Sequence, residues 1–492
     1  MNLSAITLTN GEKPWPGIDI PVERITSDSR RVSEGTIFAA WKGENSDGHA
    51  FISDAVSRGA VAVLCDDTHV ESISVPVFRS RNVRSDYALI AYKLAGIEKN
   101  TLLLVGVTGT NGKTTTTQLI AQILRRLGNK VGTIGTLGAE IDGVVFREGM
   151  TTPPAEVAAS DLARMRDSGV KICVMEVSSH ALQQERLFGL SFDAGAWTNL
   201  TPEHLDFHGS MEAYAEAKAR LFHEYCDDRS TWVMNVDDPT VAQFVEPKAF
   251  TFSLERSSQD SANLRVSEAT FSKNMTRCRF VIDETSYEIE SPLIGEFNLA
   301  NLAAAVGMVT RLGFPLSETL ACIPKLSGIP GRMELVSRGD EPLVVVDYAH
   351  TADALLKALA TLKALSHRRL ICVFGCGGDR DKEKRPAMGE VVSKYADRFV
   401  ITNDNPRTED PQIIAEMIQI GIVENARSHY SICLDREAAI EDAINACAAE
   451  DIVLIAGKGH ETYQIMGSTT LEFDDRKIAR KYLDMKFSDS VN

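Results

Sequence analysis

The sequence predicts an α/β protein of three domains, and two observations lead to that prediction. With 492 residues, the chain is too long for one compact core, and its length suggests about three domains. A short apolar, β-branched run, then a polar or glycine-rich loop, then a helical stretch recurs through residues 101–240 and again through 340–465. Strands that alternate with helices form parallel sheets. Their polar loops should then open on one side of each sheet, where ligands bind.

The expected domains are residues 1–96, 97–329 and 330–492. The first holds short strand-like runs around one helical stretch, which indicates a small α/β domain. Linkers are expected at GIEKN (96–100) and at SGIPGRM (327–333), where two glycines flank a proline. Residues 248–292 resemble strands that decorate the central domain.

Composition excludes several classes of protein. A hydrophobic content of 44% and a charged content of 24% are typical of a globular protein. No apolar run reaches the roughly 18 residues that a membrane helix needs, and the first residues lack the pattern of a signal peptide, so we expect a cytoplasmic protein. A net charge of −16 argues against nucleic-acid binding. The nine cysteines lack metal-ligand spacing, which favours reduced thiols. We expect a monomer.

The segment GVTGTNGKTT (106–115) predicts a phosphate-binding loop. It follows the strand-like TLLLVGV and precedes the helical QLIAQILRRLG, which is the required context. Backbone N–H groups and a helix N-terminus would face the phosphates, Lys113 would reach the outer ones, and Thr114 could ligate Mg²⁺. Val107 stands where the strict pattern has glycine, so the loop is a variant. The alternative, a glycine turn with an exposed lysine, leaves the flanking strand and helix unexplained.

Together with further segments along the chain, this variant loop resembles the Mur ligase family. These enzymes add amino acids to bacterial cell-wall precursors. The matching segments are TSDSR (26–30), TTP (151–153), EVSSH (176–180), TNLTPEHLDFHG (198–209), AKARLF (217–222), GEFNLANLAAA (295–305), GRME (331–334), DYAHT (347–351), GGDRDKEKRP (377–386), DNPR (404–407) and GKGHE (457–461). The resemblance implies a UDP-binding N-terminal domain, a central P-loop ATPase and a Rossmann-like C-terminal domain.

By the same resemblance, a carboxylate of UDP-MurNAc-L-Ala-D-Glu attacks the γ-phosphate of ATP and becomes an acyl phosphate, which the incoming amine then displaces. Metal and lysine charge would offset the repulsion between the two anions. The implied catalytic residues are Lys113, Glu176, His204 and Lys218, and the implied Mg²⁺ ligands are Thr114, Glu176, His204 and carbamylated Lys218.

Three of these residues have competing interpretations. Glu176 ends an apolar strand, a position that suits a metal ligand, and the alternative is a solvated surface carboxylate. By pattern alone Lys218 is an exposed helix lysine, and only the resemblance makes it a carbamylated metal ligand. His208 could be confused with His204, because Thr201-Pro202-Glu203 departs from the common Ser-Arg-Asp.

The resemblance also assigns substrate contacts. ATP would be held by Gly109, Thr110, Asn111, Gly112, Lys113, Thr114, Thr115, Asn298, Asn301, Arg332 and His350, at a domain interface completed by closure. The UDP-muramyl dipeptide would be held by Ser27, Ser29, Arg30, Thr151, Thr152, Ser178, Gln184 and Arg186, and Met150 replaces a common asparagine. For short stretches such as these, turn and capping chemistry is the alternative.

The loops of the last third indicate which amino acid is added. Asp404 and Glu461 can accept from ammonium groups, and Arg407 and Arg380 can grip carboxylates. Two ammonium and two carboxylate groups describe meso-2,6-diaminopimelate, and DNPR resembles the diaminopimelate-adding type. The expected contacts are Arg380, Asp404, Asn405, Pro406, Arg407, Gly457 and Glu461. L-Lysine is the alternative substrate, but it would leave Arg407 without its carboxylate.

Other functions remain open at this stage. Folylpolyglutamate synthases and other Mur ligases share the phosphate loop, but should lack DNPR together with GKGHE. A nucleotide-regulated binding module would bind ATP without ligase chemistry, and would not need a second metal site. A structural cell-wall protein is disfavoured by the absent signal peptide.

Overall fold

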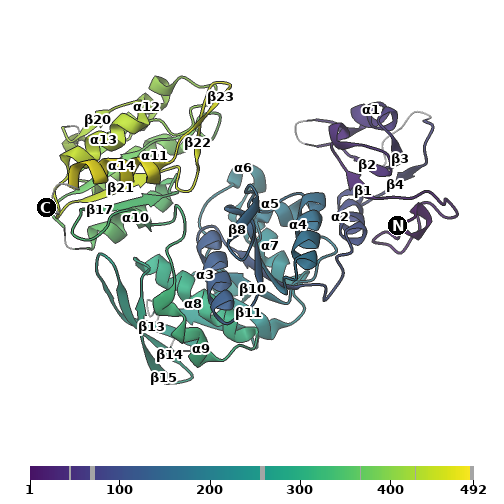
Figure 1. The fold of residues 1–492 in the computed structure, drawn as a ribbon, viewed down its shortest axis with the longest axis horizontal. Coiled ribbons are helices and arrows are strands. Elements are labelled where there is room, and N and C mark those ends of the chain that lie inside the picture. The colour runs from purple at the N-terminus through teal and green to yellow at the C-terminus, as the bar shows by residue number, and fades with distance from the viewer. Residues whose placement is uncertain (44–45, 67–72, 255–260, 366, 427, 488–492) are drawn as a thin grey trace. The chain divides into compact units, whose positions relative to one another are not determined.

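The computed structural model describes residues 1–492 apart from 44–45, 67–72, 255–260, 366, 427 and 488–492. These residues form two compact units (Figure 1). The first comprises Met1–Asn263 and Leu302–Thr319, and the second comprises Leu264–Asn301 and Leu320–Asn492. The domain boundaries expected from the sequence at 96/97 and 329/330 stay a prediction.

The N-terminal part of the first unit is a small parallel sheet with the strand order β1-β2-β3-β4. Its strands are β1 (Arg24–Thr26), β2 (Thr36–Ala40), β3 (Ala60–Cys65) and β4 (Val77–Arg79), and its helices are α1 (Ile52–Ser57) and α2 (Val83–Leu94). All five residues of β2 are buried, because this strand lies inside the sheet and is covered on both faces. The expected small α/β domain is present.

The central sheet of the first unit has the strand order β12-β11-β10-β5-β9-β6-β7-β8. Its strands are β5 (Leu103–Thr108), β6 (Val131–Gly135), β7 (Gly138–Ile141), β8 (Val144–Arg147), β9 (Ile172–Glu176), β10 (Ala194–Trp197), β11 (Trp232–Asn235) and β12 (Phe250–Ser253). Pairing is parallel from β12 to β6 and antiparallel at β7 and β8. The helices of this part are α3 (Lys113–Arg126), α4 (Ala155–Asp167), α5 (Ser179–Gln183), α6 (Leu205–His208) and α7 (Met211–His223).

Strand β5 lies between β10 and β9, with Val105 opposite Ala194 on one side and Val174 on the other. All three strands therefore end at the same edge of the sheet. The predicted α/β class with a mainly parallel central sheet is confirmed.

The second unit contains an antiparallel ribbon, a six-stranded sheet and a hairpin. The ribbon consists of β13 (Leu264–Phe271), β14 (Thr276–Ile282) and β15 (Thr285–Ser291). The sheet, with the order β16-β17-β21-β18-β19-β20, consists of β16 (Glu334–Leu335), β17 (Leu343–Asp347), β18 (Leu370–Phe374), β19 (Arg398–Ile401), β20 (Tyr430–Ile432) and β21 (Ile452–Ala456). The hairpin consists of β22 (Tyr463–Met466) and β23 (Thr469–Glu472).

Helices cover both faces of the six-stranded sheet. Alternate residues of β17 point to opposite faces: Val345 packs in a core with α10, α11 and α12, and Val344 in a core with α13 and α14. The covering helices are α10 (Ala352–Lys363), α11 (Lys384–Tyr395), α12 (Pro411–Gln419), α13 (Arg436–Ala446) and α14 (Asp475–Phe487). Two further helices, α8 (Glu296–Arg311) and α9 (Leu316–Ala321), precede this sheet in the chain, and the residues of each are divided between the two units. A parallel sheet between two helix layers is the expected Rossmann-like architecture.

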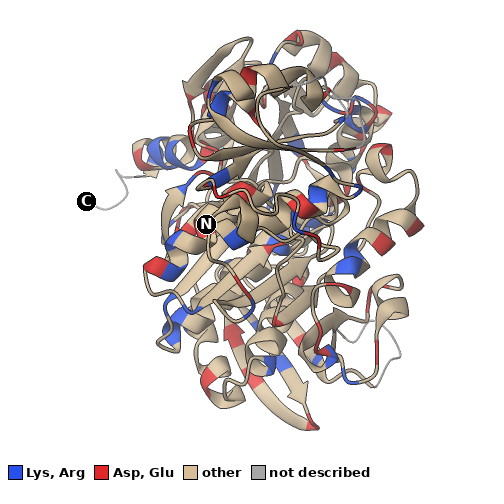
Figure 2. Cartoon of the chain, turned by 90° about the vertical axis from the view of Figure 1, so that its right-hand side faces the viewer, with Lys and Arg blue, Asp and Glu red and all other residues tan. Residues whose placement is uncertain are grey.

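Charged residues of both signs are interspersed over the helices and loops seen in Figure 2. Among the helices of the described residues, none has the length and apolar character that crossing a membrane requires.

Candidate active site

A tight loop at the carboxyl end of β5 carries the predicted phosphate-binding residues. Gly109 has φ +144°, and a Cβ at this position would overlap Thr198 Oγ1, so only glycine fits. Gly112, also at positive φ, directly precedes α3, so the N-terminus of that helix opens on the loop. Lys113 Nζ donates to the carbonyls of Gly109 and Thr110 at 2.8 Å each. Backbone N–H groups, a helix N-terminus and an ammonium group suit a polyphosphate.

The loop after β10 supports the phosphate-binding loop. The N–H of Thr110 donates to the Asn199 carbonyl at 3.0 Å, and the N–H of Asn111 donates to Asn199 Oδ1 at 2.9 Å. Thr198 Oγ1 donates to the Asn111 carbonyl at 2.6 Å. The polar loops after two neighbouring strands therefore lie side by side, as the sequence pattern predicts.

Glu176, the last residue of β9, is buried against the phosphate-binding loop. Its side chain accepts from Thr114 Oγ1 at 3.1 Å, and from the N–H and Oγ1 of Thr136 at 2.8 and 3.0 Å. The residue is 1% exposed. A solvated surface carboxylate is excluded, and the carboxylate and the Thr114 hydroxyl lie together as a hard cation would require.

Lys218 on α7 is 1% exposed, so the exposed helix lysine suggested by the pattern alone is wrong. The pattern misleads because α7 packs its middle turn beneath the phosphate-binding loop. Lys218 Nζ donates to the Gly109 carbonyl at 3.0 Å and lies 4.5 Å from the centre of the Tyr214 ring. Burial, followed by the charge of Lys113, lowers the pKa of Lys218 well below its usual value. Burial therefore disfavours the charged ammonium relative to that of an exposed lysine.

His204 and His208 have different environments. His204 adopts φ +56°, and its side chain is 45% exposed with Nε2 3.8 Å from Glu203. His208 is buried and its Nε2 lies 2.9 Å from Ser179 Oγ. Burial lowers the pKa of both rings, and the charges of Lys113 and Lys218 contribute to the lowering at His204. His204 is thus the histidine that is near both lysines and open to a ligand.

A pocket of about 350 Å³ within the first unit contains several of the predicted substrate residues. It is lined by Ser27, Trp41, Gly43, Ser46, Arg84, Tyr87, Pro154, Ala155, Gln184, Glu185 and Arg186. Gln184 accepts from the Arg186 guanidinium at 2.7 Å, and that guanidinium also donates to the Thr152 carbonyl at 2.6 Å. Aromatic rings beside guanidinium groups suit a base or sugar that carries phosphate.

The five other predicted substrate residues lie outside this lining. Thr152 Oγ1 donates to the Glu176 carbonyl and accepts from the N–H of Ser178, at 2.8 and 2.9 Å. Thr151 Oγ1 lies 3.2 Å from Thr136 Oγ1. Ser29 is buried. Thr151, Thr152 and Ser178 therefore link the pocket region to Glu176.

Arg30 lies apart from the pocket lining. Its guanidinium pairs with Asp28 at 2.8 Å, and its side chain is 83% exposed. The hydrogen bonds to Asp28 therefore explain its conformation without a ligand.

Four residues predicted to contact ATP lie in the second unit, where Asn298 and Asn301 are buried and Arg332 and His350 are half-buried. Asn298 donates to the Ile294 carbonyl at 2.8 Å, and Asn301 donates to Asn298 Oδ1 at 3.4 Å. The Arg332 guanidinium lies 4.6 Å from the centre of the Tyr348 ring. His350 Nδ1 lies 2.8 Å from the Tyr348 carbonyl.

The DNPR and GKGHE segments meet at the carboxyl ends of β19 and β21. Asn405 donates to Glu461 Oε2 at 2.9 Å, and Lys458 donates to both Asn405 Oδ1 and Glu461 Oε2, at 3.1 and 3.0 Å. Asp404 packs against Gly457, where a Cβ would crowd its carboxylate. The N–H of Ile465 in the hairpin donates to Asn405 Oδ1 at 2.9 Å. The two segments form one polar cluster, as predicted.

Two arginines flank Gly377 beside this cluster. Arg407 adopts φ +52° and donates to the Gly378 carbonyl at 2.8 Å. Arg380 is exposed and donates to its neighbour's carbonyl at 3.2 Å. Cationic groups and the carboxylates of Asp404 and Glu461 therefore line the same strand ends, an arrangement that suits a zwitterionic ligand.

Three family models match the chain: "Mur ligase family, catalytic domain" over residues 21–95, "Mur ligase middle domain" over 107–309, and "Mur ligase, glutamate ligase domain" over 331–459. The chain belongs to the Mur ligase family. A UDP-N-acetylmuramoyl-L-alanyl-D-glutamate--2,6-diaminopimelate ligase of Geobacillus kaustophilus is 40% identical, with 92% of this chain and 93% of that protein covered. The ligase of the same name from Gloeobacter violaceus is 42% identical, with 96% and 95% covered. A solved structure of a ligase with this name superposes with a TM-score of 0.69 at 35% identity, with 96% of both chains covered.

Sequence reasoning missed several residues of this Mur ligase. Trp41, Arg84 and Tyr87 line the pocket, but they lie in segments that carry no recognised motif. His180 stacks on Phe207 at 4.1 Å and meets the His204 ring edge-on at 4.7 Å. Burial, then the neighbouring charges of His204 and His208, lowers the pKa of His180 to about 4. Its place in EVSSH was the available signal.

Proposed function

We propose that this Mur ligase joins meso-2,6-diaminopimelate to UDP-N-acetylmuramoyl-L-alanyl-D-glutamate, with ATP as the energy source. Relatives with that name align along more than nine-tenths of the chain, and the site contains groups for each reactant. The observation that carries the choice of amino acid is the cluster of Asp404, Arg407 and Glu461 at the carboxyl ends of β19 and β21, the two strands that flank β18. The product would be the UDP-muramyl tripeptide of peptidoglycan precursor synthesis.

The chemistry requires an activated carboxylate. A glutamate carboxylate of the dipeptide attacks the γ-phosphorus of ATP, and the bond to ADP breaks, which leaves an acyl phosphate. The amine of diaminopimelate then attacks the acyl carbon, an amide forms, and phosphate leaves with the bonding electron pair. Lys113 would hold the outer phosphates, and the pocket that includes Gln184 and Arg186 would hold the nucleotide-linked substrate. Positioning and charge stabilisation supply most of the acceleration in such transfers.

The donor set fits Mg²⁺. Thr114 and Glu176 present oxygens 3.1 Å apart, and buried Lys218, once carbamylated, would add an anionic oxygen near His204. Among the described residues, no three His, Cys, Asp or Glu side chains gather as a ready metal site. Bound Mg²⁺ would offset charge between the carboxylate and ATP.

The environment of the reaction follows from its reactants. ATP and a UDP-linked precursor are cytoplasmic compounds, so we place the enzyme in the cytoplasm. The proposed reaction needs residues of one chain only, and we propose a monomer.

A competition assay with purified protein tests the amino acid. Phosphate release in the presence of ATP, Mg²⁺ and the muramyl dipeptide should depend on meso-diaminopimelate. L-Lysine lacks the distal carboxylate, and we expect discrimination against it on the order of ten thousand in kcat/KM. Mass spectrometry of the product identifies the added residue. Preference for L-lysine would refute the diaminopimelate assignment and leave the ligase assignment intact, whereas no dependence on any amino acid would refute both.

A further inference from the structure

Helix α13 begins with an arginine whose guanidinium is enclosed among three elements of the second unit. Arg436 and Asp475 have fully buried side chains and form a two-bond ion pair, at 2.8 Å from Nε and 2.7 Å from Nη2. The guanidinium makes two more hydrogen bonds. Nη1 donates to the Asn403 carbonyl at 3.1 Å and Nη2 donates to the Ala456 carbonyl at 2.9 Å.

The Asn403 and Ala456 carbonyls lie directly before the two loops of the amino-acid site. Asn403 immediately precedes Asp404 of DNPR, and Ala456 immediately precedes Gly457 of GKGHE. β19 and β21 are not paired with each other, because β18 lies between them. One guanidinium therefore spans two non-adjacent strand ends at the residues where each strand becomes a loop. Asp404 packs on Gly457 with no space for a methyl group, so a small change in the spacing of these strand ends would displace both loops.

We propose that Arg436 is a positioning residue for the amino-acid site. Together with Asp475, it fixes the spacing between the DNPR and GKGHE loops, and so the separation between the groups that grip the two ends of diaminopimelate. The inference rests on the proposed function of those loops. An ion pair buried in a core contributes little stability compared with apolar side chains of the same volume. A guanidinium, however, offers planar, fixed donors that can join a carboxylate and two carbonyls at once.

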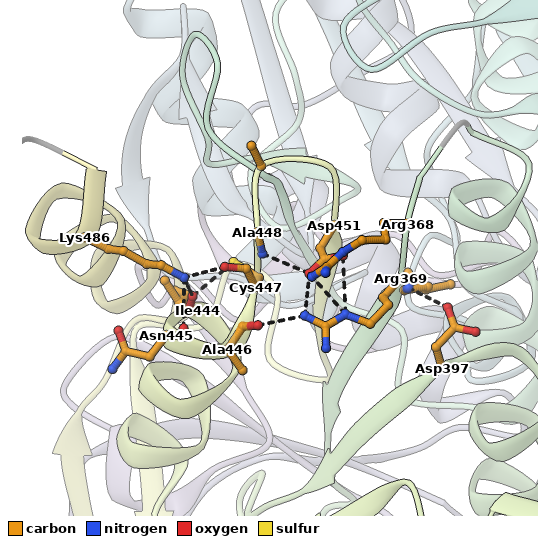
Figure 3. A network of polar contacts seen from close by, with 12 residues as sticks. Arg368, Arg369, Asp397, Ile444, Asn445, Ala446, Cys447, Ala448, Asp451 and Lys486 are labelled. Atoms are coloured by element: carbon orange, nitrogen blue, oxygen red, sulfur yellow. Dashed lines mark hydrogen bonds and ion pairs between the residues drawn. The ribbon is translucent and has the colours of Figure 1, made fainter. Parts of the chain in front are cut away.

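The same sheet contains a matched control at its opposite edge (Figure 3). Asp451 is fully buried and precedes β21, where it accepts from Arg368 at 2.8 Å and from Arg369 at 2.7 Å. Arg369 precedes β18 and also donates to the Ala446 carbonyl at 2.8 Å. This network ties the amino ends of β18 and β21, at the edge away from DNPR and GKGHE. Its loss should reduce stability without moving the amino-acid site.

The test compares Arg436→Lys and Asp475→Asn with Asp451→Asn in the full chain. Lysine keeps a charge for Asp475 but cannot reach both carbonyls. We expect KM for diaminopimelate to rise roughly 10- to 100-fold in both Arg436→Lys and Asp475→Asn, the cost of displacing a positioned group by about 1 Å. KM for ATP and for the muramyl dipeptide should change less than about twofold, because their residues lie elsewhere. Asp451→Asn should lower the midpoint of thermal unfolding at least as much as Arg436→Lys and Asp475→Asn do. All three KM values should nevertheless stay unchanged in Asp451→Asn.

Equal increases in all three KM values, or an increase in the diaminopimelate KM of Asp451→Asn, would overturn the inference, since either result indicates general loosening of the sheet. An unchanged diaminopimelate KM in both Arg436→Lys and Asp475→Asn would overturn it as well. If Arg436→Lys does not fold, Asp475→Asn decides alone. The unsubstituted enzyme separates this inference from the proposed function: if it prefers L-lysine, the substrate assignment fails, and the same comparison is made with the L-lysine KM.

Discussion

At the residue scale, Lys218 combines an ionisable group with nearly complete burial. Its amine donates to the Gly109 carbonyl of the phosphate-binding loop rather than to a carboxylate. Burying an ammonium without a carboxylate partner is costly, and this burial lowers the pKa of Lys218 well below its usual value. A neutral amine can take up carbon dioxide, which converts the side chain into an anion that needs a cation as its partner. The proposed modification therefore resolves a charge problem that the fold creates.

Substitution of Lys218 tests this explanation. Lys218→Ala should lower kcat by at least about 100-fold, the cost of losing a charged group at the reacting phosphate, whereas Lys218→Glu restores an anion and should keep part of the activity. Enzyme depleted of carbon dioxide should lose activity and regain it with bicarbonate. Mass spectrometry of the native protein should detect one added carbon dioxide. Equal inactivity of both variants, with no modification by bicarbonate, would contradict the prediction.

Sequence reasoning could place residues whose positions depend on a local strand or helix, but not residues whose positions depend on packing between distant segments. Glu176 and Thr114 were predictable, because a strand end and a helix start fix their positions within a few residues. The burial of Lys218 was not predictable from the sequence. It depends on which turn of α7 packs beneath the phosphate-binding loop, which lies more than 100 residues earlier in the chain. Trp41, Arg84 and Tyr87 line the pocket through the packing of separate segments, which no local pattern records.

At the element scale, Glu409 connects the loop that follows β18 to the loop that follows β19. Its carboxylate accepts from both Arg385 Nη atoms, at 3.0 and 2.9 Å, and from the N–H of Asp379 at 2.6 Å. The hydrogen bonds from Arg385 are the main cause that lowers the pKa of Glu409 from 4.5 to about 2. The connection between these loops therefore depends on an ionised carboxylate. The sequence predicted both loops, but it did not indicate this link.

Glu409 should make stability depend on pH in a defined window. Because the folded-state pKa is the lower one, the contribution is complete above the ordinary value of 4.5 and is lost as pH falls toward about 2. In Glu409→Gln the free energy of unfolding should be lower near neutral pH and should fall less steeply between these values. Urea denaturation at a series of pH values measures how steeply the free energy of unfolding falls with pH in the unsubstituted protein and in Glu409→Gln. Glu416→Gln, which neutralises an exposed carboxylate on α12, should keep the slope of the unsubstituted protein, and an identical slope in Glu409→Gln would refute the assignment.

At the scale of the whole molecule, the tryptophans make the two compact units distinguishable. All four tryptophans of the chain, at positions 15, 41, 197 and 232, belong to the first unit. Three of them are almost fully buried, at 2% exposure or less. Tryptophan fluorescence therefore reports the unfolding of the unit that contains the phosphate-binding loop, whereas far-ultraviolet circular dichroism reports helices and strands of both.

A non-hydrolysable ATP analogue with Mg²⁺ should shift the fluorescence transition to higher temperature. A ligand that binds only the folded state at about 100 times its Kd adds roughly 2.7 kcal/mol of stability, which is a shift of several degrees. Lys113→Ala removes the ammonium that donates to the loop, and the shift should shrink markedly in this variant because the outer phosphates lose their cation. If the analogue moved the fluorescence midpoint equally in both proteins, the nucleotide would bind without Lys113, and the phosphate-binding role of residues 109–115 would fail. The comparison between the two proteins isolates Lys113, because both keep the same tryptophans and the same second unit.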